Sequence, residues 1–371
     1  MKKLRIRIVG GSLAGLFAGI LLQNAGHDVR LYERSVSGLA GRGAGLVGQS
    51  DLLRILRLIG SEYVAQVGVV ARERIHLNRD GSIAQTVHMP QTQISWDILF
   101  DTLAWRIAPG SYVLGRQVVD VVDGAAGAEL IFADGTRETA DLVIGADGLG
   151  SAVRRAVSPE DHQNRYSGYV AWRGLIPETS LHMDAKLLLD RFAFYVQPGV
   201  HVLGYLVPGS KGERQSGSRR YNWVWYRKVL EGELAGTFTD MENRGHAFSL
   251  PRGGLSGDRL KALRDDARQI LPHQFALAVA AEPSPSIQGI FDYESPRMIG
   301  RSIALIGDAA FVARPHTAMG VSKAAGDVMA LSNCLAQEGD LTTALQSYEA
   351  ERIVVGRDIV AYGRELGASA L

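Results

Sequence analysis

At the start of the chain, the spacing of apolar and polar residues changes twice, and each change marks a new predicted element. In residues 4–9, apolar side chains alternate with basic ones, which is the pattern of a half-buried strand. A mainly apolar run over residues 14–25 predicts a helix, and "HDVRLYER" (27–34) predicts a second strand. These three segments predict a right-handed β-α-β unit with parallel strands.

The same start also imitates a secretory signal, in which basic residues precede an apolar run. However, the basic residues alternate with apolar ones, and the following run contains four glycines before Gln23 and Asn24 interrupt it. Because a membrane span needs about 20 apolar residues, the pattern favours a folded domain over a signal or an anchor.

The pattern changes again along the chain. Helical spacing at 50–60 and 96–104 alternates with short strand-like runs, and "NRDG" (78–81) predicts a hairpin turn. From Tyr166, apolar residues alternate with polar or aromatic ones, which is typical of an antiparallel sheet with one covered face. A helical region follows at about 230–282.

The last segments return to the first pattern. "RSIALIGDAA" (301–310) predicts a buried parallel strand, and helices are expected at 318–337 and 341–368. The simplest arrangement is an α/β nucleotide domain interrupted by an antiparallel sheet domain. We expect the first domain to comprise residues 1–72, 91–165 and 285–371, and the second to comprise residues 73–90 and 166–284.

Composition narrows the function. The 371 residues suffice for one large or two interleaved domains. A net charge of +1 argues against a nucleic-acid or membrane-surface partner. The single cysteine, Cys334, excludes an internal disulfide and a cysteine-based metal site, and no other metal site is expected. One cysteine also fits a reducing cytoplasm, where we expect the protein.

A glycine-rich loop lies between the first predicted strand and helix. In "GGSLAG" (10–15), Gly10 suits the tight turn and Gly15 suits close packing of helix on strand. The middle glycine of G-x-G-x-x-G is replaced by Ser12. Glu33 ends the second strand, where an acidic residue accepts hydrogen bonds from a ribose. A glycine-rich turn in another α/β fold is the alternative.

Two further strand ends carry acidic residues. "DLVIGADGLGSAVRR" (141–155) places Asp147 directly after a buried strand. "ALIGDAAFVARPHTAMG" (304–320) places Asp308 after another, with Pro315 and Gly320 ahead of a helix. A carboxylate beside a helix N-terminus can bind a sugar hydroxyl while the helix dipole supports a nearby anion.

These motifs, in this order, resemble those of the class A FAD-dependent aromatic hydroxylases, a group of flavoprotein monooxygenases, over nearly the whole chain. The resemblance implies a Rossmann-like FAD-binding domain of the glutathione-reductase type with an inserted antiparallel-sheet substrate domain. It implies FAD as the cofactor and NAD(P)H as a transient co-substrate. It also implies hydroxylation of an electron-rich aromatic or N-heteroaromatic ring by O2 through a flavin C4a-hydroperoxide. A homodimer is an option in this family, although the sequence identifies no interface.

The resemblance also assigns FAD contacts to individual residues. The pyrophosphate would lie against Gly10, Ser12, Leu13 and Ala14, the adenosine ribose against Glu33 with Arg34 alongside, and the adenine against the backbone of Val118. The ribityl chain would lie against Asp308, and the isoalloxazine against 315–322, including Pro315, Gly320, Val321 and Ser322. Asp147 would serve FAD binding and the docking of NAD(P)H.

The chain departs from the family pattern at two places. Many relatives carry an arginine near the position of Trp96 that reaches the pyrophosphate, and Arg42 is the candidate substitute here. The common run P-x-x-G-x-G-x-N reads "PHTAMGVS", with Ala318 and Ser322 in place of glycine and asparagine. These departures weaken individual flavin contacts rather than the family resemblance.

Hydroxylation requires the exclusion of water and a group that helps to deprotonate a ring hydroxyl, best with a pKa near the working pH. His316 follows Pro315 in the expected flavin-facing loop, and His201 and Tyr205 share one face of the strand "HVLGYLV". We expect these three to be the catalytic candidates. Tyr195 and Trp172 are candidates for substrate contact. A structural histidine and an aromatic core face are the alternative interpretations.

Other functions remain open on the sequence alone. They are a FAD-dependent hydroxylase or epoxidase of a polyketide or antibiotic, a non-catalytic flavin-binding protein, and an NAD-dependent dehydrogenase that uses only the glycine loop. Flavin halogenases are disfavoured because "NWVWYR" (222–227) lacks the isoleucine and proline of their W-x-W-x-I-P motif.

Overall fold

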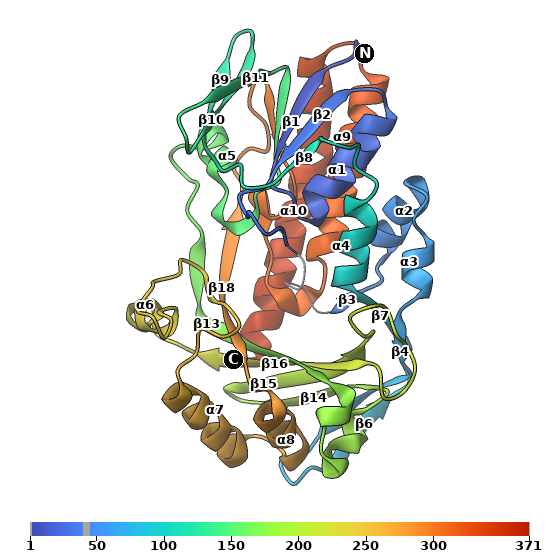
Figure 1. Cartoon of the computed structure of the whole chain (residues 1–371), viewed down its shortest axis with the longest axis vertical. Helices are drawn as coiled ribbons and strands as arrows, with labels where there is room; N and C mark the ends of the chain where they lie inside the picture. The colour runs from blue at the N-terminus through green and yellow to red at the C-terminus, as the bar shows by residue number, and fades with distance from the viewer. Residues whose placement is uncertain (1, 40–44, 371) are drawn as a thin grey trace.

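The computed structural model describes residues 2–39 and 45–370, and it has two parts (Figure 1). A parallel sheet with its helices occupies the top of that view, and a large, mostly antiparallel sheet lies below it. The architecture predicted from the sequence, an α/β domain with an inserted antiparallel sheet, is confirmed.

Five parallel strands form the upper sheet. In spatial order they are β19 (Ile303–Leu305), β12 (Leu142–Gly145), β1 (Arg5–Val9), β2 (Asp28–Tyr32) and β8 (Tyr112–Val113). The register places Val9 beside Gly145, and Gly145 beside Leu305, so three strands end side by side. The three predicted motifs follow these strand ends, and they therefore meet at one edge of the sheet.

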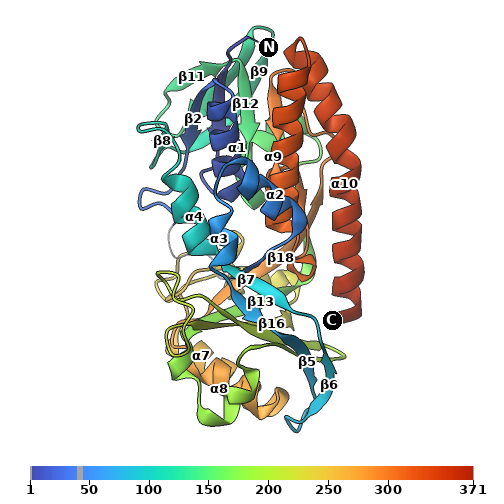
Figure 2. The ribbon, with the colours of Figure 1, turned by 90° about the vertical axis from the view of Figure 1, so that its right-hand side faces the viewer.

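Helices from both ends of the chain cover this sheet. Figure 2 shows α9 beside α1, with the long α10 packed along α9. The helices of this part are α1 (Leu13–Asn24), α2 (Ser50–Leu58), α3 (Tyr63–Gln66), α4 (Trp96–Ala104), α5 (Ala152–Val157), α9 (Gly320–Gln337) and α10 (Leu341–Ala370). No helix among the described residues is both long enough and apolar enough to cross a membrane.

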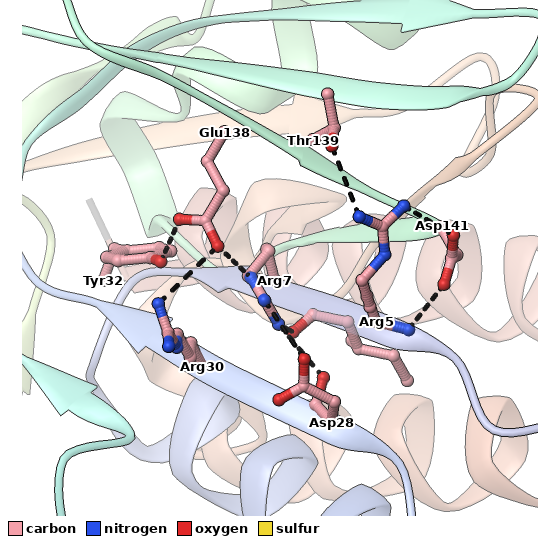
Figure 3. Close-up of polar contacts among 9 residues, drawn as sticks. Arg5, Arg7, Asp28, Arg30, Tyr32, Glu138, Thr139 and Asp141 are labelled. Atoms are coloured by element: carbon pink, nitrogen blue, oxygen red, sulfur yellow. Dashed lines mark hydrogen bonds and ion pairs between the residues drawn. The ribbon is translucent and has the colours of Figure 1, made fainter.

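A three-stranded meander of β9 (Val118–Gly124), β10 (Gly127–Phe132) and β11 (Arg137–Ala140) is joined to the parallel sheet by charged side chains (Figure 3). Arg7 is buried on β1, and its guanidinium donates to Glu138 (2.5 Å) and to Asp28 (3.2 Å). The Tyr32 hydroxyl donates to the other oxygen of Glu138. Because Glu138 accepts hydrogen bonds from both β1 and β2, its carboxylate fixes the meander against the parallel sheet.

The lower sheet has nine strands. In spatial order they are β17 (Ser249–Leu250), β18 (Ser286–Glu294), β13 (Arg165–Pro177), β16 (Arg220–Lys228), β15 (Val200–Val207), β14 (Arg191–Gln197), β5 (Glu73–Leu77) and β6 (Ile83–Val87), with β20 (Phe311–Val312) pairing with β18. All neighbours are antiparallel except β14 and β5. Because β18 pairs with β13, the sheet continues to Glu294, beyond the boundary at residue 284 expected from the sequence.

The two faces of the lower sheet have different neighbours. Helices α7 (Gly257–Ile270) and α8 (His273–Ala281) cover one face, where Trp223 and Trp225 are fully buried in an apolar core. The opposite face points toward the parallel sheet and lines a cavity. The region predicted as helical at about 230–282 also contains the short helix α6 (Leu234–Thr237) and β17.

One small sheet was not predicted. The strands β3 (Gly45–Val47), β7 (Gln91–Ser95) and β4 (Val69–Ala71) form an antiparallel sheet between the two larger parts. Two of these strands have only three residues, too few for an alternation of apolar and polar positions to be recognised.

We predict that Gly15→Ala destabilises the protein by about 1–3 kcal/mol, because it overpacks the contact between α1 and the glycine loop. A Cβ atom at Gly15 would lie 2.0 Å from the carbonyl oxygen of Gly10, which is rigid backbone. The free energy of unfolding, measured by urea denaturation, checks this.

Gly236→Ala in α6 is the matched control, because a Cβ atom there has no neighbour within 4 Å. Its expected change is within about 0.5 kcal/mol. Equal stability of the two variants would contradict the importance of the close approach at Gly15.

Candidate active site

The loop between β1 and α1 brings backbone, rather than side chains, to the strand ends. Gly10 has a φ of +106°, and a Cβ atom there would lie 2.3 Å from the carbonyl oxygen of Ala146. Ser12 is the N-cap of α1, and its side chain makes no capping hydrogen bond. The first amides of α1 therefore remain available for an anion, as the sequence suggested.

The predicted ribose-binding carboxylate is held in place by the same loop. Glu33 is only 6% exposed, and it accepts hydrogen bonds from the backbone N–H groups of Gly11 (3.0 Å) and Ser35 (2.9 Å). A carboxylate has about four acceptor positions, so Glu33 keeps capacity for ligand hydroxyls.

A cavity of about 190 Å³ lies beside Glu33. Five of the residues predicted from the motifs line it, and these are Gly10, Glu33, Arg34, Val118 and Asp147. They come from β1, the end of β2, β9 and the end of β12, so the fold brings together four separate segments. A carboxylate fixed by two amides next to a glycine turn fits the adenosine part of a dinucleotide.

Asp147 has a local structural role in addition to the cofactor role expected for it. Its carboxylate accepts hydrogen bonds from the N–H groups of Ala152 (2.7 Å) and Val153 (3.2 Å), and from the Ser151 hydroxyl (2.5 Å). Burial raises the pKa of Asp147, and these hydrogen bonds oppose that rise. The carboxylate thus caps α5 and fixes the wall of the cavity.

Arg154, which the sequence analysis did not assign to the site, connects the second and third motifs. Its side chain is buried, and it donates to the carbonyl oxygens of Asp308 (2.6 Å) and Ala309 (2.8 Å) and to Asn164 (2.9 Å). The available signal was an arginine in the first turn after the Asp147 motif.

The third motif rests on a buried ionic network that also went unpredicted. The Lys323 ammonium donates to the carbonyl oxygen of Gly307 (2.7 Å), while Asp327 accepts from the Gly307 N–H (3.0 Å). Arg352 of α10 donates to the other oxygen of Asp327 (2.9 Å). Residues of α9 and α10 therefore fix the backbone that presents Asp308.

A second cavity, of about 910 Å³, lies between this strand end and the lower sheet. Among the predicted flavin contacts, Asp308, Pro315, Gly320 and Val321 line it. Surrounding protein raises the pKa of Asp308, chiefly by desolvation, while the charge of Lys323 opposes the rise. These residues present an acidic group and a helix N-terminus, which suits the ribityl chain and ring of a flavin.

Several other predicted contacts lie differently. The Leu13 side chain is in the apolar core, and Ala14 lies against Gly307. Ser322 is buried in the first turn of α9 and is not among the residues that line the larger cavity. Arg42 lies outside the described residues. Sequence position alone therefore located the loops but not each side chain.

Ala318 occupies the position where the family pattern has glycine. Its φ is +53°, in the left-handed region that costs a residue with a Cβ roughly 1–2 kcal/mol. The loop keeps the conformation for which glycine is suited although the residue has changed.

The three catalytic candidates lie together in the larger cavity. His201 and Tyr205 of β15 and His316 of the loop before α9 all line it. The rings of His201 and His316 are 5.3 Å apart, and the Tyr226 ring is 4.3 Å from His316. His316 Nε2 is hydrogen-bonded to the Tyr169 hydroxyl (2.9 Å).

The polar atoms of this cluster are unusual. Both ring nitrogens of His201, and Nδ1 of His316, are buried and have no hydrogen-bond partner among the described residues. Desolvation lowers the pKa of His201 to about 4 and that of His316 to about 3. Both imidazoles are therefore neutral near pH 7, which differs from the expected base with a pKa near the working pH.

Tyr195 and Trp172, the expected substrate contacts, lie on the other face of the sheet. Tyr195 is 5% exposed and Trp172 is 8% exposed, and both belong to the core under α7 and α8. Tyr195 pairs with Val202, so it shares a face with that residue and not with His201. The expected contact with substrate is therefore wrong for both, because side chains alternate between faces along a strand.

No group of histidine, cysteine, aspartate and glutamate side chains in the described part of the chain could hold a metal ion.

Comparison with known proteins agrees with this geometry. Residues 3–197 match a family model described as FAD binding domain, and residues 166–292 match one described as FAD binding domain-like. The chain is 30% identical to 2,6-dihydroxypyridine 3-monooxygenase of Paenarthrobacter nicotinovorans, over 95% of this chain and 88% of that protein. It is 28% identical to 6-hydroxynicotinate 3-monooxygenase of Pseudomonas fluorescens, over 94% and 87% of the two chains.

Solved structures show the same relationship. The structure of 2,6-dihydroxypyridine-3-hydroxylase from Arthrobacter nicotinovorans superimposes with a TM-score of 0.93 at 29% identity, covering 100% of this chain and 93% of that one. A structure of Klebsiella pneumoniae HpxO complexed with FAD and uric acid shares the fold, with a TM-score of 0.78 at 23% identity over 99% and 89% of the chains. The resemblance stated from the motifs is confirmed, and the chain belongs to the FAD-binding-domain family, as a FAD-dependent monooxygenase.

Proposed function

We propose that the protein hydroxylates an electron-rich aromatic or N-heteroaromatic ring, with NAD(P)H and O2 as co-substrates. The observation that carries this proposal is the pair of neutral imidazoles, His201 and His316, in the cavity that Asp308 also lines. Relatives at similar identity are named for hydroxypyridine, hydroxynicotinate and aminohydroxybenzoate oxidation, which supports a small ring as the substrate.

The residues present fit FAD at two positions. The smaller cavity beside Glu33 suits the adenosine, and the loop from Gly10 to Ala14 leads from it toward α1 and the larger cavity. Asp308 and the segment 315–321 would hold the ribityl chain and the ring system. When bound, FAD supplies the chemistry that activates O2 for transfer to the substrate.

His201 is the group best placed to accept a proton from a ring hydroxyl. A neutral imidazole with two unpaired nitrogens can receive a hydrogen bond, and removing the phenolic proton raises the electron density of the ring. His316 is held by Tyr169, so its ring orientation is fixed by the protein before substrate binds. We propose that His201 accepts the proton and that His316 lies beside it against the substrate ring.

The remaining walls are suited to exclude water. Phe192, Phe194 and Tyr205 line the cavity, and their rings pack against one another at 4.6–4.7 Å. An apolar enclosure protects a reactive oxygen species from water, and it strengthens the hydrogen bonds made by the few polar groups inside.

The proposed function is tested with the purified, FAD-loaded protein. We expect NAD(P)H oxidation and O2 uptake to rise with 2,6-dihydroxypyridine, 6-hydroxynicotinate or 3-amino-4-hydroxybenzoate, and a hydroxylated product to form. Absence of a hydroxylated product with all three, although flavin is bound, would count against the proposal.

We predict that His201→Gln lowers kcat by about 100-fold or more, because it removes the proton acceptor, as expected for general base catalysis. Turnover of the preferred ring substrate, measured as hydroxylated product, checks this. His273→Gln is the control, since that side chain is exposed at the start of α8. An unchanged kcat for His201→Gln would remove His201 from the proposed role.

We predict that Glu33→Gln weakens FAD binding by about 10- to 100-fold. A neutral amide has fewer acceptor positions than the carboxylate once the two backbone N–H groups are bound, so a charge-assisted hydrogen bond to the ligand, worth about 1.5–3 kcal/mol, would be lost. FAD dissociation, followed by fluorescence, measures the change. Glu160→Gln, at an exposed position, is the control and is expected to bind FAD normally.

The buried histidines predict a pH dependence of stability. Their folded pKa values, about 4 and about 3, lie below the unfolded value of about 6.5, so the unfolded chain binds more protons between these limits. Their stabilising contribution is therefore complete above about pH 6.5 and is lost as the pH falls through that window, with a slope of up to about 1.4 kcal/mol per pH unit for each group.

Unfolding free energies measured across this window test the sign. The double variant His201→Gln, His316→Gln should show a shallower fall on acidification than the wild type, while His273→Gln should keep the wild-type slope. Parallel curves for the double variant and wild type would show that the two imidazoles are not the source.

A further inference from the structure

An arginine on the wall of the larger cavity has no counter-ion. Arg173 lies on β13, next to Trp172 but facing the opposite way, and it lines the cavity. Its Nε is buried without a hydrogen-bond partner, and its guanidinium takes part in no ion pair among the described residues. A buried N–H of a cation that lacks a partner is costly, so a bound ligand is the natural source of compensation.

Arg314 and Asp308, two other charged residues of this cavity, have roles of their own. Arg314 is paired with Asp292 (2.8 Å). Asp308 is the one acidic residue among the described residues that line the cavity, and it belongs to the strand end proposed to hold the cofactor. The electrostatic balance of the substrate space is therefore positive, and Arg173 and Arg74 are the two lining arginines without an ion pair among the described residues.

The register of the sheet places this charge near the proposed proton acceptor. Arg173 pairs with Val224, and Val224 pairs with Leu203, two residues along β15 from His201. Arg173 and His201 are two strands apart across the sheet and two residues apart along the strand direction. Their backbones are therefore about 12 Å apart. The side chains of both residues and a single aromatic ring can span that distance.

The hydroxyl groups nearby respond to the same charge. Burial raises the pKa values of Tyr205 and Tyr226, and the positive charge of Arg173 opposes the rise for both. Arg173 thus acts electrostatically on groups along the cavity wall. An anionic ligand in this space would feel the same field.

Arg74 is a second arginine on this wall, but its position is less suitable. It donates to Gln91 (2.8 Å), although its Nε is also unpaired. It lies on β5, two strands from β15 and on the opposite side of β15 from β13. Arg74 pairs with Phe192, which lies beside Tyr205, and Tyr205 is four residues along β15 from His201. The backbone of Arg74 is therefore about 16 Å from that of His201.

We propose that Arg173 selects substrates that carry an anionic oxygen on the ring, either a carboxylate or an ionised ring hydroxyl, and that it orients the ring toward His201. The inference rests on the proposed function and names its substrate class. The planar guanidinium can bind such an oxygen with charge-assisted hydrogen bonds, which are among the stronger ones in proteins.

The test compares ligands that differ in one carboxylate group. 6-Hydroxynicotinate and 2-hydroxypyridine share a ring and a hydroxyl, but only the first has a carboxylate. Their dissociation constants are measured on the FAD-loaded protein from the change in flavin absorbance. We expect Arg173→Met to weaken 6-hydroxynicotinate binding by about 10- to 100-fold and to change 2-hydroxypyridine binding by less than about threefold. Arg173→Lys should restore part of the loss.

A second arm distinguishes the ionised ring hydroxyl from the carboxylate. 2,6-Dihydroxypyridine is titrated over the pH range in which its ring hydroxyl ionises. If the ring oxyanion is the ligand, wild-type affinity rises with ionisation and the rise disappears in Arg173→Met. If only the carboxylate is recognised, the effect of the variant is confined to 6-hydroxynicotinate. Either pattern supports Arg173 as the anion-binding residue.

Two variants serve as controls. Arg165→Met removes an exposed arginine from the same strand and should leave the ratio of the two affinities unchanged. Arg74→Met tests the competing position. Loss of anion preference in Arg74→Met but not in Arg173→Met would overturn the assignment. So would equal weakening of charged and neutral ligands in Arg173→Met at normal FAD content, or no weakening of either.

Failure of the proposed function has a different signature. In that case, wild-type protein with bound FAD would hydroxylate none of the ring compounds, and none would perturb the flavin spectrum, so both proposals would fall. Wild-type hydroxylation with an unchanged ligand preference in Arg173→Met would overturn this inference alone.

Discussion

The close approach of three strand ends is the constraint on which the rest of this structure depends. At the edge of the parallel sheet, the backbone of Gly10 lies so near that of Ala146 that a side chain has no room. This contact lets β1, β12 and β19 end beside one another, and it places a helix N-terminus, Glu33 and Asp308 around one elongated site. In the proposed binding mode, the nucleotide is held by backbone amides and two carboxylates, with few other side chains involved.

Buried charges keep this edge in position. Arg154 joins the loops after β12 and β19, and Lys323, Asp327 and Arg352 hold Gly307 from the opposite side. Buried ion pairs contribute little net stability because their desolvation is expensive, but removing one partner leaves an uncompensated charge. Their effect here is positional, since Arg154, Lys323 and Asp327 bind backbone atoms of the loop that presents Asp308, and Arg352 holds Asp327.

The lower sheet completes the site by having two different faces. One face packs its tryptophans under α7 and α8, and the other exposes His201, Tyr205 and Arg173 to the larger cavity. A strand of this sheet thus supplies core and active site from alternate residues. The same arrangement explains why an aromatic-rich sequence yields only a few ligand-facing rings, and why the polar atoms among them lack protein partners.

The sequence by itself determined the α/β architecture, the inserted sheet and the three loops, because these follow from local periodicity, glycine spacing and the order of motifs. It also predicted His201, Tyr205 and His316 as catalytic candidates, and these three residues line the larger cavity. It could not place Tyr195 or Trp172, because the face of a strand depends on register across a turn, and a shift of one residue reverses it. Arg154, Lys323 and Arg173 acquired their roles only in the tertiary structure, because what a buried charge does is decided by the distant groups packed against it.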